Sequence, residues 1–227
     1  MRLFVGWCGF PWCMFVGSWL FEGLEVVRYV RDATPVVPPE PIVELNNVSG
    51  DTLRQLLVRL RQLVSLVTVV AWARRVGLRV FVHASAMPDP VNDFVRAALA
   101  GGADGVLVDD FVSISSDLIE VVHVGEKVSD GSVNYVVVGP DVQVQQPVRA
   151  YGVILRDVVI NKEWLLRIRD KLRLTYGSKE FLAALDNSLL RREIIEELQG
   201  VVDGIVVMEI PSVVSLDFDG HKALNVF

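Results

Sequence analysis

One histidine and three aspartates stand where short apolar runs end, and they are the residues of this chain best placed to do chemistry. His83 lies at the end of a predicted strand, Asp109 and Asp110 follow another, and Asp186 follows a third. Barrel enzymes build their sites at the carboxyl ends of parallel strands. Paired carboxylates there could bind Mg²⁺ or act as general acid and base. A small-molecule enzyme would therefore bring these four side chains into one pocket.

The same residues also have plain structural explanations. A lone histidine at a strand end often only packs, and an Asp109-Asp110 pair can cap a loop. The sequence has no G-x-G-x-x-G, Walker, H-E-x-x-H or G-x-S-x-G motif. From this we predict no catalytic residue acting in the chain by itself, no metal and no cofactor.

The elements that must position these residues are valine-rich strands alternating with helices. β-branched side chains suit a pleated surface, and unbroken apolar runs are typical of parallel strands covered on both faces. The sequence predicts strands at Leu3–Val5, Pro41–Leu45, Leu78–Ala84, Gly105–Val108, Ile119–Val124, Tyr135–Val138, Gly152–Leu155, Phe181–Leu185 and Gly204–Ile210.

Helices are predicted between these strands. Capping residues and apolar spacing indicate helices at Leu53–Val64, Asp89–Leu99, Lys162–Tyr176 and Leu189–Leu198. Seven or more β–α steps favour a TIM-like barrel over an open doubly wound sheet, which stays an alternative. We therefore expect residues 1–227 to form a single α/β barrel domain of mostly parallel strands with outer helices.

The two cysteines and the apolar segments bear on location. Cys8 and Cys13 are favoured as ordinary buried thiols, with a disulfide or a redox role left open. Glycine and proline break the uncharged run Leu3–Phe21, and the run Leu63–Trp72 is too short to span a bilayer. We expect a cytoplasmic protein that does not enter a membrane.

Charge gives a mixed indication about partners. The net charge is −6, which by itself argues against nucleic-acid binding. Arginine nevertheless outnumbers lysine, and its planar guanidinium suits phosphate contacts and ion pairs. Genome composition or a thermophilic habit would give the same bias.

Several short segments, in order, resemble archaeal ribonuclease P protein component 3, the thirty-kilodalton-subunit family. Gly204–Pro211 (GIVVMEIP) followed by Ser215 resembles the ending G-x-V-x-G-M-E-x-P…S of that family. Further similar segments are Arg96–Asp104 (RAALAGGAD), Val153–Arg156 (VILR), and Asn46-Asn47 with Thr52–Arg54. Arg192 and Glu196 stand where the family has R-x-P-x-D-L.

The resemblance implies a TIM-like barrel that supports a catalytic RNA in the 5′ maturation of precursor tRNA. The implied partners are ribonuclease P RNA, precursor tRNA and a small ribonuclease P protein subunit. The chemistry would come from the RNA, so the ribonucleoprotein would be the endonuclease. The residues implied to contact RNA or partner are Arg54, Arg96, Arg156 and Arg192, with Asp104 and Glu196 orienting them through ion pairs.

A second resemblance gives the alternative function. Val5–Pro11 (VGWCGFP), with Val26-Val27 and Pro38-Pro39 downstream, looks like the start of an uncharacterised barrel family of the domain-of-unknown-function 72 type. It implies a TIM-barrel enzyme acting on a small phosphorylated or sugar-like substrate. In that case His83, Asp109, Asp110 and Asp186 would line the pocket.

Overall fold

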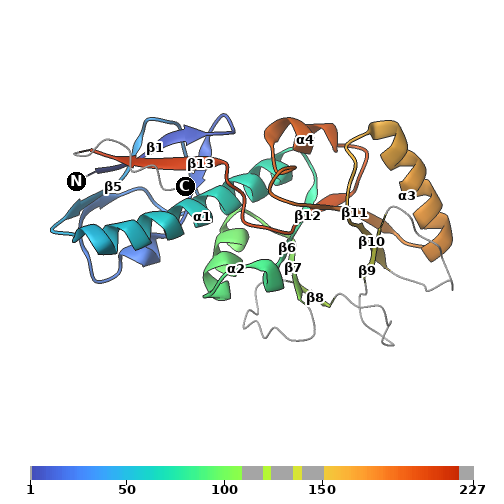
Figure 1. Cartoon of the computed structure of the whole chain (residues 1–227), viewed down its shortest axis with the longest axis horizontal. Helices are drawn as coiled ribbons and strands as arrows, with labels where there is room; N and C mark the ends of the chain where they lie inside the picture. Colours follow the sequence, from blue (N-terminus) through green and yellow to red (C-terminus); the bar gives the residue numbers. More distant parts are fainter. Residues whose placement is uncertain (1, 109–119, 124–134, 140–150, 220–227) are drawn as a thin grey trace.

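Two large sheets joined by one long helix, with a small two-stranded sheet beside them, make up the described fold. The computed structural model describes residues 2–108, 120–123, 135–139 and 151–219. In Figure 1 an antiparallel sheet lies at one end of the molecule and a parallel sheet at the other. Helix α1 (Gly50–Arg75) runs from the first toward the second.

The parallel sheet has seven strands in the order β8-β7-β6-β12-β11-β10-β9. The strands β7, β10 and β12 are buried on both faces, which explains their unbroken apolar runs. The strands are β6 (Arg79–His83), β7 (Gly105–Val108), β8 (Glu120–His123), β9 (Tyr135–Val138), β10 (Gly152–Leu155), β11 (Glu180–Leu185) and β12 (Gly204–Val207).

This sheet curls into a half-barrel, so the predicted full TIM-like barrel is wrong. In the described part of the chain, β8 ends the sheet on one side and β9 on the other, without a pairing between them. The strands nearest the N-terminus, which a barrel built from the whole chain would include, belong to separate antiparallel sheets instead. The parallel strands themselves match the predictions closely, and β7, β9 and β10 have the predicted bounds.

Helices cover the outer face of the half-barrel. They are α2 (Val91–Ala100), α3 (Lys162–Tyr176) and α4 (Arg192–Glu197), with a 3₁₀ turn η2 (Ala84–Ala86) after β6. Helix α3 has its predicted bounds because the signals at both ends are strong. The Asn161 side chain accepts a hydrogen bond from the Trp164 N–H at 2.9 Å, and Gly177 ends the helix at φ 62°.

The antiparallel sheet has the order β13-β1-β5-β3 and joins the two ends of the described chain. Its strands are β1 (Arg2–Cys8), β3 (Glu25–Tyr29), β5 (Pro41–Asn46) and β13 (Val214–Phe218). A two-stranded sheet of β2 (Cys13–Phe15) and β4 (Thr34–Val36) and the 3₁₀ turn η1 (Ser18–Phe21) complete this region. The strands β2, β3, β4 and β13 were not predicted.

Helix α1 is the core helix of both regions and is twice as long as predicted. The Ser49 side chain caps it by accepting from the Thr52 N–H. Every residue from Leu63 to Val70 is buried, so this stretch lacks the one-sided pattern of a surface helix. The helix is long and apolar enough to cross a membrane, but 72% of its apolar window is buried inside the protein. It is therefore the core helix of a soluble domain.

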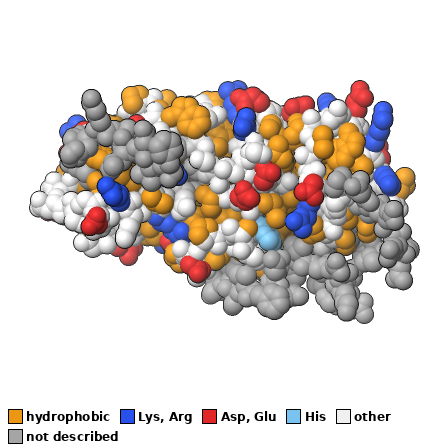
Figure 2. Space-filling model, in the orientation of Figure 1, with side chains coloured by type: hydrophobic (Ala, Val, Ile, Leu, Met, Phe, Trp, Pro, Cys, Tyr) orange, Lys and Arg blue, Asp and Glu red, His pale blue; other side chains and the backbone are white. Residues whose placement is uncertain are grey.

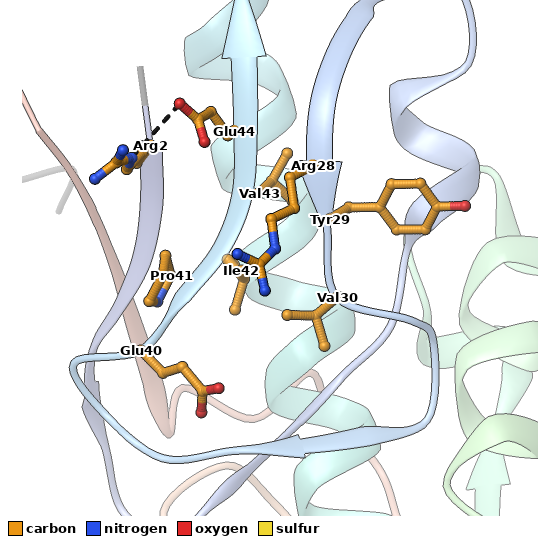
Figure 3. Close-up of a pocket in the computed structure, with 9 residues that line it drawn as sticks. All are labelled: Arg2, Arg28, Tyr29, Val30, Glu40, Pro41, Ile42, Val43 and Glu44. Carbon is orange, nitrogen blue, oxygen red and sulfur yellow. Dashed lines mark ion pairs between the residues drawn. The ribbon is translucent and has the colours of Figure 1, made fainter.

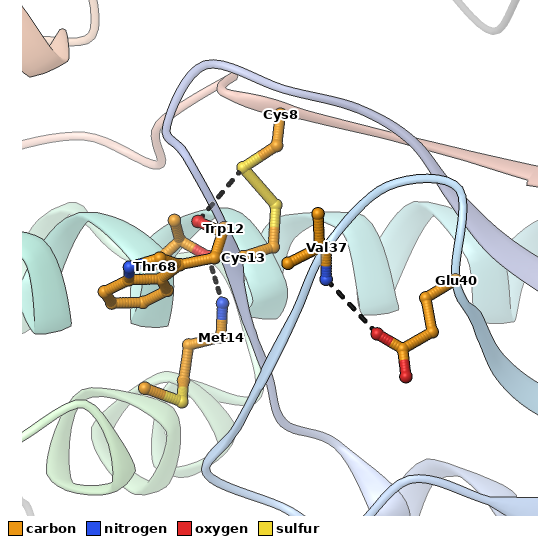
Figure 4. Close-up of a disulfide and its surroundings, with 7 residues drawn as sticks. All are labelled: Cys8, Trp12, Cys13, Met14, Val37, Glu40 and Thr68. Carbon is orange, nitrogen blue, oxygen red and sulfur yellow. Dashed lines mark hydrogen bonds between the residues drawn. A yellow bond between two sulfur atoms is a disulfide. The ribbon is translucent and has the colours of Figure 1, made fainter.

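A disulfide joins Cys8 at the end of β1 to Cys13 at the start of β2 (Figure 4). The favoured interpretation of two free thiols is therefore wrong. The bond closes a short loop whose Trp12 carbonyl oxygen lies 3.4 Å from the Cys8 Sγ. Just beyond the bond, the Met14 N–H donates to Thr68 Oγ1 of α1 at 2.9 Å. The loop is thus fixed both covalently and to the core helix.

Candidate site at the carboxyl edge of the half-barrel

The concave face of the half-barrel is an apolar surface with a polar rim. Its buried side chains form one cluster, separate from the cluster under the outer helices: Phe81, Leu107, Tyr135, Ile154, Leu182, Ala184 and Val206, with Val137 and Met208 against them. Side chains alternate between the two faces along a strand, so the residue two positions after an inward-facing residue also belongs to the concave face. Those positions are the rim.

Three polar side chains extend the inner rows at the carboxyl edge. They are His83 on β6, Arg156 directly after β10 and Asp186 directly after β11. The Arg156 N–H donates to the Val138 carbonyl at 2.8 Å, which continues the ladder and fixes its backbone. An imidazole, a guanidinium and a carboxylate at one edge can bind an anion, stabilise a cation and exchange a proton.

The strand register sets the spacing of this rim. Val82 and Leu185 both pair with Val207 of β12, so His83 and Asp186 flank Met208 at the next register position. One strand lies between them, which separates their backbones by roughly 10 Å. Arg156 is level with Ala184 on the neighbouring strand, one inner position below Asp186. His83 and Arg156 are three strand spacings apart, roughly 14 Å between their backbones, so a ligand that contacts all three residues must be long enough to bridge this span.

Asp186 is held as a carboxylate with one oxygen free. Its Oδ1 accepts from the Ser188 hydroxyl at 2.6 Å and from the N–H groups of Ser188 and Leu189. The hydrogen bond from the Ser188 side chain, followed by the backbone bonds, lowers the pKa of Asp186 below its usual range. Asp186 Oδ2 has no partner among the described residues and remains available to a ligand.

Two of the four residues of the predicted pocket, His83 and Asp186, lie among the described residues. The structure brings His83 and Asp186 to one register level, as described above. Asp109 and Asp110 lie outside the described residues, so their convergence with the other two stays a prediction. Among the described residues, no group of three His, Cys, Asp or Glu side chains could hold a metal ion.

The amino edge of the same sheet carries a closed polar cluster that the sequence analysis missed. Glu180, the first residue of β11, accepts from Arg79 Nη1 and from the Tyr135 hydroxyl, each at 2.5 Å, and from the Tyr151 hydroxyl at 3.4 Å. Burial and then the hydrogen bond to Glu180 raise the pKa of Tyr135 well above its usual value. The sequence did contain a signal for this cluster. The strands β6, β9 and β11 are mostly apolar, and each begins with a residue that carries a polar group.

Two aspartates hold neighbouring strands at this amino edge. Asp104 accepts from the Val80 N–H at 2.8 Å and pairs with Arg74 at 2.8 Å. Asp203 accepts from the Phe181 N–H at 2.8 Å and pairs with Arg173 at 2.6 Å. Asp104 precedes β7 and binds the backbone of the neighbouring strand β6, and Asp203 precedes β12 and binds the backbone of the neighbouring strand β11. Both aspartates therefore have a structural role.

The arginines predicted to contact RNA lie on different elements with different surroundings. Arg54 is exposed on α1, and the Arg96 guanidinium lies 4.1 Å from the Trp19 ring centroid. Arg156 belongs to the carboxyl edge. Arg192 lies 5.3 Å from the Trp72 ring centroid. On the face shown in Figure 2, basic and acidic side chains are interspersed, without a basic patch.

The two predicted orienting acids have different partners. Glu196 pairs with Arg192 at 2.9 Å. Asp104 pairs with Arg74, and its second oxygen lies 3.7 Å from Arg79, so it orients neither Arg54 nor Arg96.

A separate hollow of about 360 Å³ lies on the antiparallel sheet (Figure 3). The Arg28 guanidinium points across it toward Ile42 and Glu40, and Arg2 pairs with Glu44 at its rim at 3.6 Å. The residues around it come from β1, β3, β5 and the ends of the loop between β3 and β5, and they include the buried Ile42 and Val43. It is an open surface groove and is a weaker candidate than the carboxyl edge.

Comparison with known proteins identifies the fold. Neither a family model nor a curated protein matches the sequence. Solved structures do match, and three are nicotinate-nucleotide pyrophosphorylases or NadC proteins. That of Pyrococcus furiosus has a TM-score of 0.62 at 18% identity, over 95% of this chain and 67% of the other. That of Francisella tularensis has 0.55 at 15%, over 95% and 84%. NadC of Streptococcus pyogenes has 0.53 at 11%, over 96% and 85%.

These structures overturn the predicted ribonuclease P assignment. The chain is similar along nearly its whole length to nicotinate-nucleotide pyrophosphorylases, and not to a ribonuclease P subunit. The predicted RNA, precursor tRNA and small protein subunit therefore lose their support, as does the alternative of a domain-of-unknown-function 72 enzyme. Short apolar segments such as Gly204–Pro211 are common where a buried parallel strand ends in a turn. Such a segment can therefore resemble the ribonuclease P subunit family without a shared function. The chain has the fold of the nicotinate-nucleotide pyrophosphorylases.

Proposed function

We propose that this protein is an enzyme of small-molecule metabolism that cleaves or forms the bond between a phosphorylated ribose and an aromatic ring, as a nicotinate-nucleotide pyrophosphorylase does. The observation that carries the proposal is the rim of His83, Arg156 and Asp186 at the carboxyl edge of a sheet with this fold. Ligands of parallel α/β sheets bind at that edge.

The reaction consists of one bond exchange at the ribose. In the cleavage direction, an oxygen of pyrophosphate forms a bond to C1′ of the ribose. The bond from C1′ to the ring nitrogen breaks, and its electron pair stays with the nitrogen. A positively charged pyridinium thus becomes a neutral pyridine, and no proton has to move. Positive charge builds on the ribose as the old bond lengthens.

Each rim residue has a role in this exchange. The Arg156 guanidinium binds a phosphate group of the substrate through paired N–H donors. Asp186 Oδ2 lies free to face the ribose, and a carboxylate stabilises the positive charge that develops there. His83 donates a hydrogen bond to the attacking or leaving group. The apolar floor below them excludes water, which would otherwise compete as the nucleophile.

The test is to incubate the purified protein with nicotinate mononucleotide, pyrophosphate and Mg²⁺ and to measure released nicotinate by chromatography. We expect release by the unmodified protein and at least about a hundredfold loss of kcat/KM in Arg156→Ala. Arg54→Ala, which removes an exposed arginine from α1, is the matched control and should leave the rate unchanged. Neither turnover nor binding of the nucleotide by the unmodified protein would refute the proposal.

A cytoplasmic location accompanies this proposal. A nucleotide substrate is an intracellular metabolite, and the apolar helix α1 is used in the core. The Cys8–Cys13 bond then implies a cytoplasm that tolerates protein disulfides, as that of hyperthermophiles does. Alkylation of cell extract followed by mass spectrometry should find both cysteines protected.

A further inference from the structure

A cavity of about 520 Å³ lies outside the half-barrel, where the tip of β1 meets the loops after β11 and β12. Its floor is formed by Phe10, Leu190 and Val213, which belong to the core cluster under the outer helices. The floor of the cavity is therefore on the side of the sheet under the outer helices, and Asn187 and Ser188 of its lining directly follow Asp186 of the rim. Its volume is that of a site for a small organic ligand.

Trp7 is turned toward this cavity by an irregularity in β1. Leu3 and Val5 are buried, so strict alternation would bury residue 7 as well. The pairing with β13 shifts between Val5 and Trp7, and Trp7 is instead 56% exposed. A bulge that redirects a side chain is a common feature beside binding sites.

The indole of Trp7 is supported on one side only. A Cβ at Gly9 would lie 3.3 Å from the ring and 3.7 Å from Val213, so the ring packs over Gly9 next to the cavity floor. The Gly9 N–H donates to the Val213 carbonyl at 2.8 Å and keeps this support in place. More than half of the Trp7 surface remains open to a second ring.

Arg191 supplies a positive charge at the same cavity, whose lining also includes Arg192 and the carboxylate of Glu193. It is exposed, and no carboxylate in the described part of the chain pairs with it. The adjacent Arg192 differs, because it pairs with Glu196 at 2.9 Å and lies over Trp72. Asn187 adds a donor, because its Oδ1 accepts from the Ser212 N–H at 2.8 Å and its amide NH₂ stays free among the described residues.

We propose that this cavity binds a planar aromatic acid, whose ring stacks on Trp7 and whose carboxylate pairs with Arg191. An inorganic anion would use Arg191 but leave Trp7 and the apolar floor in water. A neutral ring would stack but leave Arg191 and Asn187 unpaired. Only a ligand with both features uses Trp7, Arg191 and the apolar floor together. The site is additional to the one proposed for the nucleotide and does not depend on it.

The experiment measures benzoate binding to the full chain by ligand-observed NMR. Cyclohexanecarboxylate keeps the charge and removes the aromatic ring, and benzamide keeps the ring and removes the charge. We expect benzoate to bind at least about fivefold more tightly than either. Trp7→Ala and Arg191→Ala should each weaken benzoate binding at least about fivefold, because each removes one of the two contacts.

Matched variants separate this site from general effects and from the nucleotide site. Tyr29→Ala removes an equally exposed aromatic ring on β3, and Arg54→Ala removes an exposed arginine on α1. Both should bind benzoate as the unmodified protein does, whereas any benzoate bound at the nucleotide rim would be lost in Arg156→Ala and kept in Trp7→Ala. Circular dichroism checks that Trp7→Ala is folded.

Several results would overturn the proposal. Equal binding of the three probes would remove the specificity for an aromatic acid. Unchanged benzoate binding in both Trp7→Ala and Arg191→Ala would place the ligand elsewhere. A change of oligomeric state in Trp7→Ala without any change in benzoate binding would assign this surface to a second copy of the chain. Loss of nucleotide turnover in Arg156→Ala alone leaves the outcome here unaffected.

Discussion

The two edges of the parallel sheet are built differently. At the amino edge, the Glu180 carboxylate has three hydrogen-bond donors, and Asp104 and Asp203 each hold a backbone N–H and an arginine. At the carboxyl edge, Arg156 is exposed and Asp186 keeps one oxygen free. The three carboxylates of the first edge have their partners within the protein, whereas Arg156 and Asp186 of the second edge are exposed.

This difference assigns stability to one edge and binding to the other. A partly buried carboxylate with all its partners in place stabilises the fold, and removing it leaves those partners unsatisfied. A polar side chain whose donors or acceptors have no partner in the protein contributes little to folding but can bind a ligand. Substitutions at the amino edge should therefore change the free energy of unfolding, and those at the carboxyl edge should change function.

The largest effect is expected for Glu180→Ala. The Glu180 side chain is 14% exposed, and its loss leaves the Arg79 guanidinium and the buried Tyr135 hydroxyl without their shared acceptor. We expect the free energy of unfolding to fall by about 3 kcal/mol, measured by urea denaturation. Glu197→Ala, an exposed carboxylate on α4, is the control and should change it by less than about 0.5 kcal/mol. Equal stabilities of the two variants would contradict a structural role for the cluster.

A smaller loss is expected for Asp203→Ala. The substitution removes the acceptor of the Phe181 N–H and the partner of Arg173, and should cost about 2 kcal/mol in the same measurement. Asp170→Ala removes an exposed carboxylate on α3 and should be nearly neutral. If Asp203→Ala proves as neutral as Asp170→Ala, then the aspartate does not hold the two strands together.

The smallest effect concerns Tyr135 and depends on pH. Its pKa is raised in the folded protein, so the stability that its neutral hydroxyl contributes is complete below about pH 10, the ordinary value, and declines as the pH rises further. Tyr135→Phe should cost about 1 kcal/mol at pH 8 and should flatten the fall of stability above pH 10. Urea denaturation at several pH values measures both. A fall of the same steepness in the variant would show that other groups cause it.

The sequence predicted the parallel region well and the antiparallel region poorly. Strands such as β9 and β10 and helix α3 carry strong local signals, namely unbroken apolar runs and caps. The strands β3 and β13 have mixed, partly exposed patterns, and β4 contains a proline, so none of them stands out from a loop. The second half of α1 lacks one-sided periodicity because it is buried all round.

The candidate site was predictable only in outline. His83, Arg156 and Asp186 follow from the rule that polar residues after buried strands meet at one edge. The failure of the barrel to close depends on which strands pair, and local patterns do not encode that choice. Arg79, Tyr135 and Glu180 join three strands from distant parts of the chain, and Trp7 faces outward only because β1 is irregular.

One paired measurement tests the division between the two edges most directly. Arg156→Ala and Glu180→Ala are compared for kcat/KM with nicotinate mononucleotide and pyrophosphate, below the unfolding range of both, and for free energy of unfolding. Arg156→Ala should lose at least about a hundredfold in kcat/KM and less than about 0.5 kcal/mol in stability. Glu180→Ala should lose about 3 kcal/mol in stability and keep kcat/KM within about threefold. An Arg156→Ala variant that is unstable but fully active, or a Glu180→Ala variant that is stable but inactive, would contradict the account.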